Sequence, residues 1–134
     1  MIKRYRVLIA DKNSRIRRFL KREFTLAGYA VRLADSSDAL LKLIYGPSRL
    51  DLLILDPDLP DVDADFLSRK LQDRVPPLPV VLHTLAPDEA SPRFSLTPAE
   101  FVEKKGNSVE DLKKTVSKIL RPLEDNPQAM HKKE

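Results

Sequence analysis

The 134-residue sequence contains no cysteine and no tryptophan, two histidines and three glycines. Without cysteine the chain can form no disulfide bond, thiolate metal site or cysteine nucleophile. The two histidines, His83 and His131, are too few and too far apart to indicate a zinc site or a catalytic triad. Glycine occurs only at positions 28, 46 and 106, so there is no glycine-rich phosphate loop, and a small nucleotide-binding enzyme is the least favoured functional class.

Long hydrophobic runs are absent as well. No apolar run approaches the ~18 residues of a membrane span, and the first six residues lead directly into a strand rather than into a signal-peptide core. We therefore expect a cytoplasmic protein without membrane contact. The net charge is only +4 and aromatic residues make up 6% of the chain, without interleaving of basic and aromatic residues, which argues against nucleic-acid binding.

Short apolar runs and helical patterns alternate along the chain. Aliphatic runs bounded by polar or strand-breaking residues predict strands that are buried on both faces. These runs are Arg6–Ala10, Leu52–Leu55 and Val80–Thr84. The alternating run Tyr29–Leu33 predicts a strand nearer the sheet edge, and Phe101–Glu103 predicts a short last strand.

Helices are predicted between these strands from capping residues and from apolar residues at helical spacing. The expected caps and stops are Asn13 or Ser14 and Gly28 for the first helix, residues 36–38 for the second, Asp63 for the third, and Ser108, with Asp111 in the capping-box position, for the last.

This alternation predicts an α/β fold, a doubly wound five-stranded parallel sheet with helices on both faces. A fourth helix should lie between Leu85 and Glu100, but three prolines interrupt that stretch, so we expect this helix to be degenerate or missing. Residues 1–121 should form one domain, and the polar residues 122–134 should form a flexible tail.

Polar side chains stand at the carboxyl ends of four predicted strands, namely Asp11, Asp56, Thr84 and Lys104. In an open parallel sheet these ends share one edge, so the four side chains should lie together. Such a set suits phosphoryl chemistry: one carboxylate can be the nucleophile, the other can help to hold a magnesium ion, and the hydroxyl and ammonium can bind the transferred oxygens. The residues by themselves also leave open a polar cluster of strand ends without chemistry.

From Tyr5 to Leu120 the chain resembles the receiver domain of bacterial two-component response regulators, the CheY-like family. The resemblance rests on segments 7–11, 53–60, 83–84 and 101–104. It implies a flavodoxin-like, receiver-type fold. It also implies a phosphorelay function, in which the domain accepts a phosphoryl group from a histidine kinase, a phosphotransfer protein or a small phosphodonor.

The resemblance also implies roles for individual residues. Asp56 would be the phosphoacceptor, and Thr84 and Lys104 would contact the phosphoryl oxygens. Asp11, Asp56 and the main-chain carbonyl of Asp58 would bind a magnesium ion as cofactor.

Lys12 is the main departure from the family pattern. Receivers usually carry two adjacent acids after the first strand, and the second acid is a direct metal ligand. Lysine at this position removes one oxygen ligand and reverses the local charge, so magnesium affinity should fall sharply. Either Lys12 points into solvent and leaves a weakened metal site, or its ammonium takes the place of the metal and pairs with Asp11 and Asp56.

Other departures concern the switch that reports phosphorylation. Leu85 follows Thr84 where a small residue is usual, and it could crowd Asp56. The resemblance implies Thr84 and Phe101 as the switch residues. Phe101 stands at the aromatic switch position but lacks a hydroxyl group, so it could report only by packing. The interrupted stretch between the last two strands replaces part of the face through which many receivers dimerise or meet their targets.

The favoured function is a stand-alone receiver, because no output domain follows Leu120. We expect this receiver not to be an enzyme. Its partners would be a histidine kinase or phosphotransfer protein and a target protein of unknown identity, and a homodimer remains open. The alternative is a pseudo-receiver, which keeps the fold as a protein interaction module that works without phosphorylation.

Overall fold

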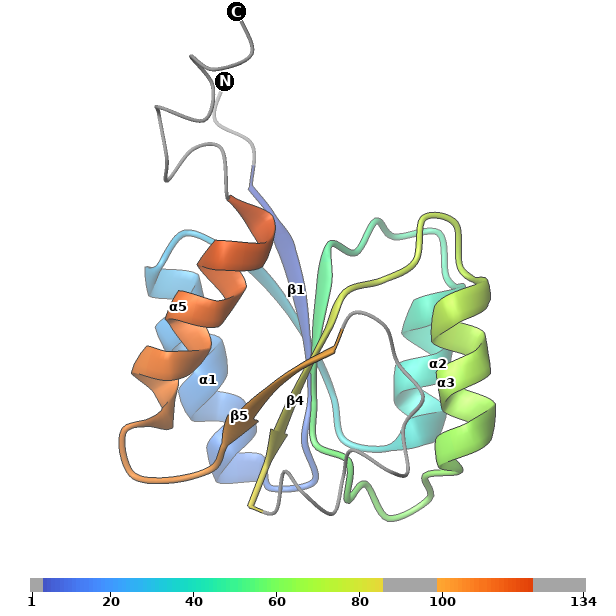
Figure 1. Ribbon diagram of the computed structural model, residues 1–134, viewed down its shortest axis with the longest axis horizontal. Coiled ribbons are helices and arrows are strands. Elements are labelled where there is room, and N and C mark those ends of the chain that lie inside the picture. The colour runs from blue at the N-terminus through green and yellow to red at the C-terminus, as the bar shows by residue number, and fades with distance from the viewer. Residues whose placement is uncertain (1–3, 86–98, 122–134) are drawn as a thin grey trace, which may run out of the picture.

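The computed structural model describes residues 4–85 and 99–121. Five strands form one parallel sheet between two layers of helices (Figure 1). The strand order is β2-β1-β3-β4-β5, which confirms the predicted doubly wound sheet. In chain order the elements are β1 (Arg6–Ala10), α1 (Ser14–Leu26), β2 (Ala30–Ala34), α2 (Ser37–Tyr45), β3 (Leu52–Leu55), α3 (Ala64–Asp73), β4 (Val80–Thr84), β5 (Ala99–Glu103) and α5 (Ser108–Leu120).

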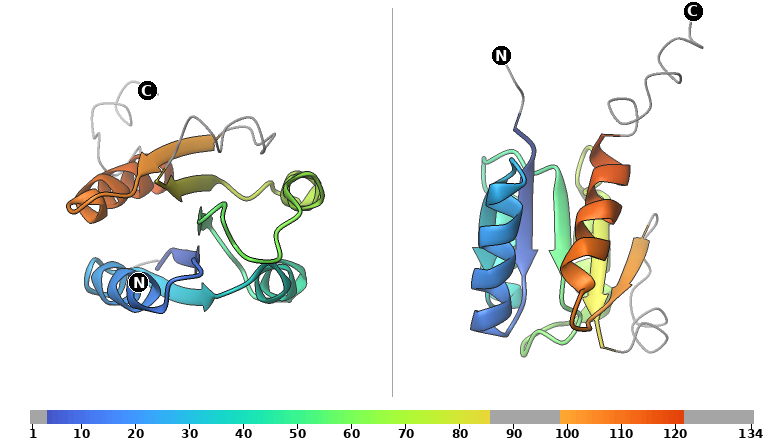
Figure 2. Two further views of the ribbon diagram at one scale, coloured as in Figure 1. Left: turned by 90° about the horizontal axis from the view of Figure 1, so that it is seen from below. Right: turned by 90° about the vertical axis from the view of Figure 1, so that its left-hand side faces the viewer.

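The central strands are aliphatic throughout because helices cover both of their faces. Along β3, Leu53 and Leu55 pack toward α2 and α3, whereas Leu52 and Ile54 pack toward α1 and α5. Figure 2 shows the two helix pairs on opposite sides of the sheet. Alternate residues of a strand point to opposite faces, so one strand contributes to two separate cores.

Side-chain caps fix the starts of three helices, as the sequence predicts. Asn13 accepts hydrogen bonds from two main-chain amides of α1, Ser36 accepts one in α2, and Asp63 accepts one in α3. After α1, Gly28 adopts a φ of 100°, a left-handed conformation that favours glycine, and this ends the helix.

The predicted cap of the last helix is wrong. Asn107 occupies the N-cap position of α5 and makes no side-chain capping hydrogen bond, and Ser108 is already the first residue of the helix. The hydroxyl of Ser108 instead shares a hydrogen bond of 3.0 Å with Nε2 of His83 on β4. The hydroxyl group that the capping pattern assigned to the helix end is therefore bonded to His83 of β4.

The last strand is longer than the sequence pattern indicates. It begins at Ala99 rather than at Phe101, and its five residues pair with the whole of β4. The backbone of β4 extends the ladder to residues that carry no apolar strand signal. The structure describes four helices. We expected a degenerate or missing helix between Leu85 and Glu100, and residues 86–98 of that stretch lie outside the described residues. The predicted tail 122–134 also lies outside them.

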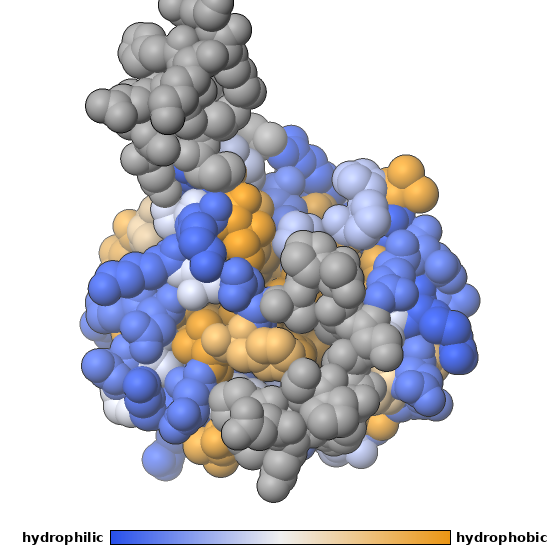
Figure 3. All heavy atoms as spheres, viewed as in Figure 1, coloured by the Kyte–Doolittle hydropathy of each residue, from blue (hydrophilic) through white to orange (hydrophobic). Residues whose placement is uncertain are grey.

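Hydrophilic side chains cover the outer surfaces of the helices on both sides of the molecule (Figure 3). Within residues 4–85 and 99–121, no helix is both long enough and apolar enough to cross a membrane.

Candidate functional site

The carboxyl ends of four parallel strands bring the predicted site residues to one edge of the sheet. Asp56 follows β3, and its main-chain amide donates a hydrogen bond of 2.8 Å to the carbonyl of Ala10 at the end of β1. On the other side, the amide of Lys104 donates a 2.8 Å hydrogen bond to the carbonyl of Thr84. These main-chain contacts extend the sheet by one residue beyond the strands and fix where the polar side chains begin.

The ammonium group of Lys104 lies between two buried carboxylates. Its Nζ is 3.0 Å from Oδ2 of Asp11 and 3.4 Å from Oδ2 of Asp56. Both aspartates are 2% exposed, and the side chain of Lys104 is 13% exposed. In surroundings that exclude water, one cation that faces two anions leaves the cluster with a net negative charge and a need for further cations or donors.

The two oxygens of Asp56 are held unequally. Oδ1 accepts a 2.9 Å hydrogen bond from the main-chain amide of Asp58. Among the described residues, Oδ2 receives the longer 3.4 Å contacts of the Lys12 amide and the Lys104 ammonium. Oδ2 is therefore the oxygen that is easier to engage in a new bond.

Burial raises the pKa of the Asp11 carboxyl. The main-chain amide of Asn13, at 2.9 Å, and the Lys104 ammonium oppose this shift, while the nearby charge of Asp56 adds to it. Burial and the charge of Asp56 therefore disfavour ionisation of Asp11, whereas the hydrogen-bond donors favour it.

The structure places Thr84 and Phe101 differently with respect to this cluster. Thr84 is buried at the end of β4, and its carbonyl is joined directly to Lys104. Phe101 lies further back on β5, opposite Leu82, and is 38% exposed, so it stands outside the charged cluster.

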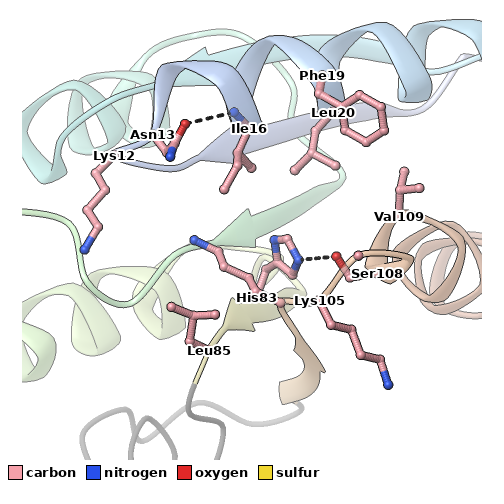
Figure 4. Close-up of a pocket in the computed structure, with 12 residues that line it drawn as sticks. Lys12, Asn13, Ile16, Phe19, Leu20, His83, Leu85, Lys105, Ser108 and Val109 are labelled. Carbon is pink, nitrogen blue, oxygen red and sulfur yellow. Dashed lines mark hydrogen bonds between the residues drawn. The ribbon is translucent and has the colours of Figure 1, made fainter.

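Lys12 does not occupy the space between the carboxylates. Within the described part of the chain it forms no ion pair with Asp11 or Asp56, and its side chain is exposed. Figure 4 shows this side chain extending toward the loop that follows β3. The ammonium between the acids is that of Lys104, so the position of Lys12 is the exposed one of the first alternative.

A hollow of about 450 Å³ opens beside the cluster, between the first turns of α1 and the start of α5. Its lining includes Lys12, Lys104 and Lys105 together with apolar side chains such as Ile16 and Leu85 (Figure 4). Leu85, which the sequence suggested could crowd Asp56, is 75% exposed.

His83 also lines this hollow, and its role is not evident from the sequence. The imidazole is 3% exposed, bonds Ser108 through Nε2, and has no hydrogen-bond partner for Nδ1 among the described residues. Burial, and to a lesser degree the positive charge of Lys104, lower the pKa of His83 to about 4. A histidine inside an otherwise aliphatic strand is the one sequence signal for this contact. The partner could not be read from the sequence, because Ser108 lies 25 positions away.

Two further contacts around the site have no signal in a capping or strand pattern. The guanidinium of Arg17 donates a 2.6 Å hydrogen bond to the carbonyl of Asp11. The carboxylate of Asp61 accepts hydrogen bonds from the amides of Ser37 and Asp38 at the start of α2, at 2.6 and 3.0 Å. These bonds lower the pKa of Asp61 and anchor the loop that carries Asp58.

The oxygen atoms at this edge fit a hard cation such as magnesium, although with few charged ligands. Asp11 and Asp56 supply two carboxylates, and the main-chain carbonyl of Asp58 could supply a third oxygen. No group of three or more acidic, histidine or cysteine side chains that could hold a metal is found in the part of the chain that the structure describes.

Comparisons with known proteins agree with this geometry. A family model described as the response regulator receiver domain matches residues 7–117. The chain is 41% identical over 75 residues to the sensor protein EvgS of Escherichia coli O157:H7, a match that covers 55% of this chain and 6% of that protein. It is 33% identical over 90 residues to the response regulator MprA of Mycobacterium sp. (strain KMS), covering 67% and 38% respectively. The chain thus spans far less than two thirds of these relatives.

Solved structures share the fold. The chemotaxis response regulator CheY4 of Vibrio cholerae superimposes with a TM-score of 0.74 at 21% identity, over 88% of this chain and 100% of that one. The response regulator TrrA of Thermotoga maritima, solved in complex with Mg(2+)-BeF, has a TM-score of 0.70 at 27% identity, over 87% and 99%.

Proposed function

The chain belongs to the response regulator receiver domain family of two-component signalling, and we propose that it accepts a phosphoryl group on Asp56. The observation that carries this proposal is the buried cluster in which Lys104 lies 3.0 Å from Asp11 and 3.4 Å from Asp56. A carboxylate nucleophile, a second carboxylate and a cation within contact distance are the groups that phosphoryl transfer to an aspartate requires.

In the proposed step, Oδ2 of Asp56 attacks the phosphorus atom. A bond forms between Oδ2 and phosphorus, and the bond between phosphorus and the donor's oxygen or nitrogen breaks, with its electron pair leaving on the donor. Oδ1 stays fixed by the amide of Asp58, and Lys104 then transfers its contacts from the carboxylates to the phosphoryl oxygens. The hydroxyl of Thr84, at the end of the neighbouring strand, is the proposed second contact to these oxygens.

We propose that Asp11, Asp56 and the Asp58 carbonyl would hold magnesium weakly. A bound magnesium ion would supply positive charge against the phosphoryl oxygens. With lysine at position 12, these residues provide one acidic ligand fewer than receivers usually carry, and the ammonium of Lys104 competes for both carboxylates.

The proposed receiver domain comprises residues 1–121, since the family model ends at residue 117 and α5 ends at Leu120. Receivers of this family interact with histidine kinases or phosphotransfer proteins. We propose such a protein as the phosphodonor and a separate protein as the target, with Thr84 and Phe101 as the residues that change when Asp56 is modified.

Intact mass spectrometry after incubation with acetyl phosphate tests the proposal. The chain is incubated with magnesium in one arm and with EDTA in another, and Asp56→Asn serves as the matched control. We expect one phosphoryl adduct per chain that is absent from the control. If no adduct forms in either arm, even at high magnesium, the phosphoacceptor proposal is wrong and the domain works as a phosphorylation-independent module.

A further inference from the structure

Positive charge surrounds the way into the site. Three lysines, Lys12, Lys104 and Lys105, line the hollow beside the cluster, and no carboxylate is among the lining residues in the described part of the chain. Lys104 connects the hollow to the buried acids, because it lines the one and contacts the others. An anion that approaches through this hollow meets cations before it meets the carboxylates, which favours its entry.

Lys12 has no role in the phosphoryl transfer step proposed above, although it lies beside the reacting group. Its main-chain amide is 3.4 Å from Oδ2 of Asp56, so its backbone lies directly beside the oxygen that we propose as the nucleophile. Its side chain is exposed and reaches toward the loop after β3 (Figure 4). A lysine ammonium on a flexible stem of four carbons can move to a group bound at that oxygen.

Among the described residues Lys104, unlike Lys12, is already paired with carboxylates. Its ammonium already contacts both Asp11 and Asp56, which are buried. A phosphoryl group that arrives on Asp56 brings additional negative charge, which one ammonium cannot balance together with Asp11. A second cation is needed, and Lys12 is the cation whose backbone touches the nucleophilic oxygen.

We propose that Lys12 is a second phosphoryl-binding residue, whose ammonium binds the oxygens of the group transferred to Asp56 and reduces the need for a divalent cation. This inference rests on the proposed phosphoacceptor function. Lys12 binds the phosphoryl oxygens during and after transfer and exchanges no proton. The bond to Oδ2 forms and the donor bond breaks as described above. The ligand is the phosphoryl group itself, whether a small phosphodonor or a phosphohistidine supplies it.

The rate of labelling by acetyl phosphate in EDTA tests the inference, followed by intact mass. Lys12→Met removes the charge and keeps the length, and we expect it to slow labelling at least about tenfold, the effect of losing a charged hydrogen bond. The matched control is Lys21→Met, which removes an exposed lysine that does not line the hollow and should change the rate by less than about threefold. Lys12→Asp should abolish labelling in EDTA and restore it with magnesium. Equal rates for the wild-type chain and Lys12→Met in EDTA would overturn the inference.

A binding measurement separates this inference from the proposed function. Inorganic phosphate is titrated into the full chain in EDTA, and the amide resonances of Lys12, Asp58 and Lys104 are followed by NMR. We expect Lys12→Met to weaken phosphate binding about tenfold and Lys21→Met, which lies outside the hollow, to leave it nearly unchanged. Phosphate binding that depends on Lys12, without any covalent adduct, would contradict the phosphoacceptor function but support the anion site. Equal affinities in the wild-type chain and Lys12→Met would contradict the role of Lys12.

Discussion

At the level of single residues, the fold places titratable side chains where water does not reach them. Asp11, Asp56 and His83 are each at most 3% exposed. The acids share the Lys104 ammonium, whereas the hydrogen-bond partner of His83 among the described residues is the hydroxyl of Ser108. Protonation of the imidazole would bury a cation close to Lys104, so the folded state holds the neutral form.

His83 makes stability depend on pH in a defined window. Its pKa is about 4 when folded and near 6.5 when unfolded, so its contribution is complete above pH 6.5 and is lost as the pH falls from 6.5 to 4. We expect this loss to reach about 3 kcal/mol. His83→Gln, which does not titrate, should remove that part of the slope in urea unfolding measured across the window. His131→Gln, the other histidine, is the control, and identical slopes in the wild-type chain and His83→Gln would refute the assignment.

Lys104 should be needed for stability as well as for chemistry. Lys104→Met leaves Asp11 and Asp56 buried together without their shared cation, which should cost about 3 kcal/mol at pH 7. The loss should shrink at lower pH, because protonation of a carboxyl removes the uncompensated charge. Chemical denaturation at pH 7 and 5 measures both effects, with the exposed Lys105→Met as control. A loss for Lys104→Met no larger than that of the control would contradict the buried pairing.

At the level of elements, helix starts differ in how they are held. Asn13 bonds the amides of Arg15 and Ile16 at 2.9 and 3.2 Å, while Asn107 occupies the same position of α5 without a side-chain capping bond. The start of α5 is instead fixed to β4 through the contact of Ser108 with His83. The same residue type at the same helix position therefore contributes differently in the two helices.

This difference can be measured with two matched substitutions. Asn13→Ala should lower the free energy of unfolding by about 1 kcal/mol, the usual value for a lost N-cap. Asn107→Ala removes no side-chain cap and should cost clearly less. Thermal or urea unfolding of both variants gives the comparison, and equal losses would mean that the caps do not differ in solution.

At the level of the whole molecule, one sheet joins two cores. Leu67 of α3 lies in one core and Leu112 of α5 in the other, and both are fully buried. The central strands contribute to both cores, so neither helix layer has a core of its own without the shared sheet. We expect the domain to unfold as one cooperative unit.

Substitutions on opposite faces of the sheet test this cooperativity. Leu67→Ala and Leu112→Ala should each cost about 2–5 kcal/mol through lost burial and a residual cavity. Because the two sites share no direct contact, the double substitution should be additive to within about 0.5 kcal/mol. Calorimetry should show a single transition in every variant, and two separate transitions would contradict the shared core.

The sequence by itself determined the class of fold and the edge of the sheet at which the candidate site residues meet. Continuous aliphatic runs require strands that are covered on both faces, and alternation with helices then requires a parallel sheet. A parallel sheet places all its carboxyl ends at one edge, so Asp11, Asp56 and Lys104 had to meet there. The caps Asn13 and Asp63 were equally local, since their partners lie within three residues.

Only the tertiary structure decided which groups touch. The ammonium between the carboxylates is that of Lys104, while Lys12 is exposed beside Oδ2 of Asp56. The hydroxyl of Ser108 bonds His83 rather than capping its helix. Such contacts join residues far apart in the chain, and local periodicity and capping patterns carry no information on distances of that kind.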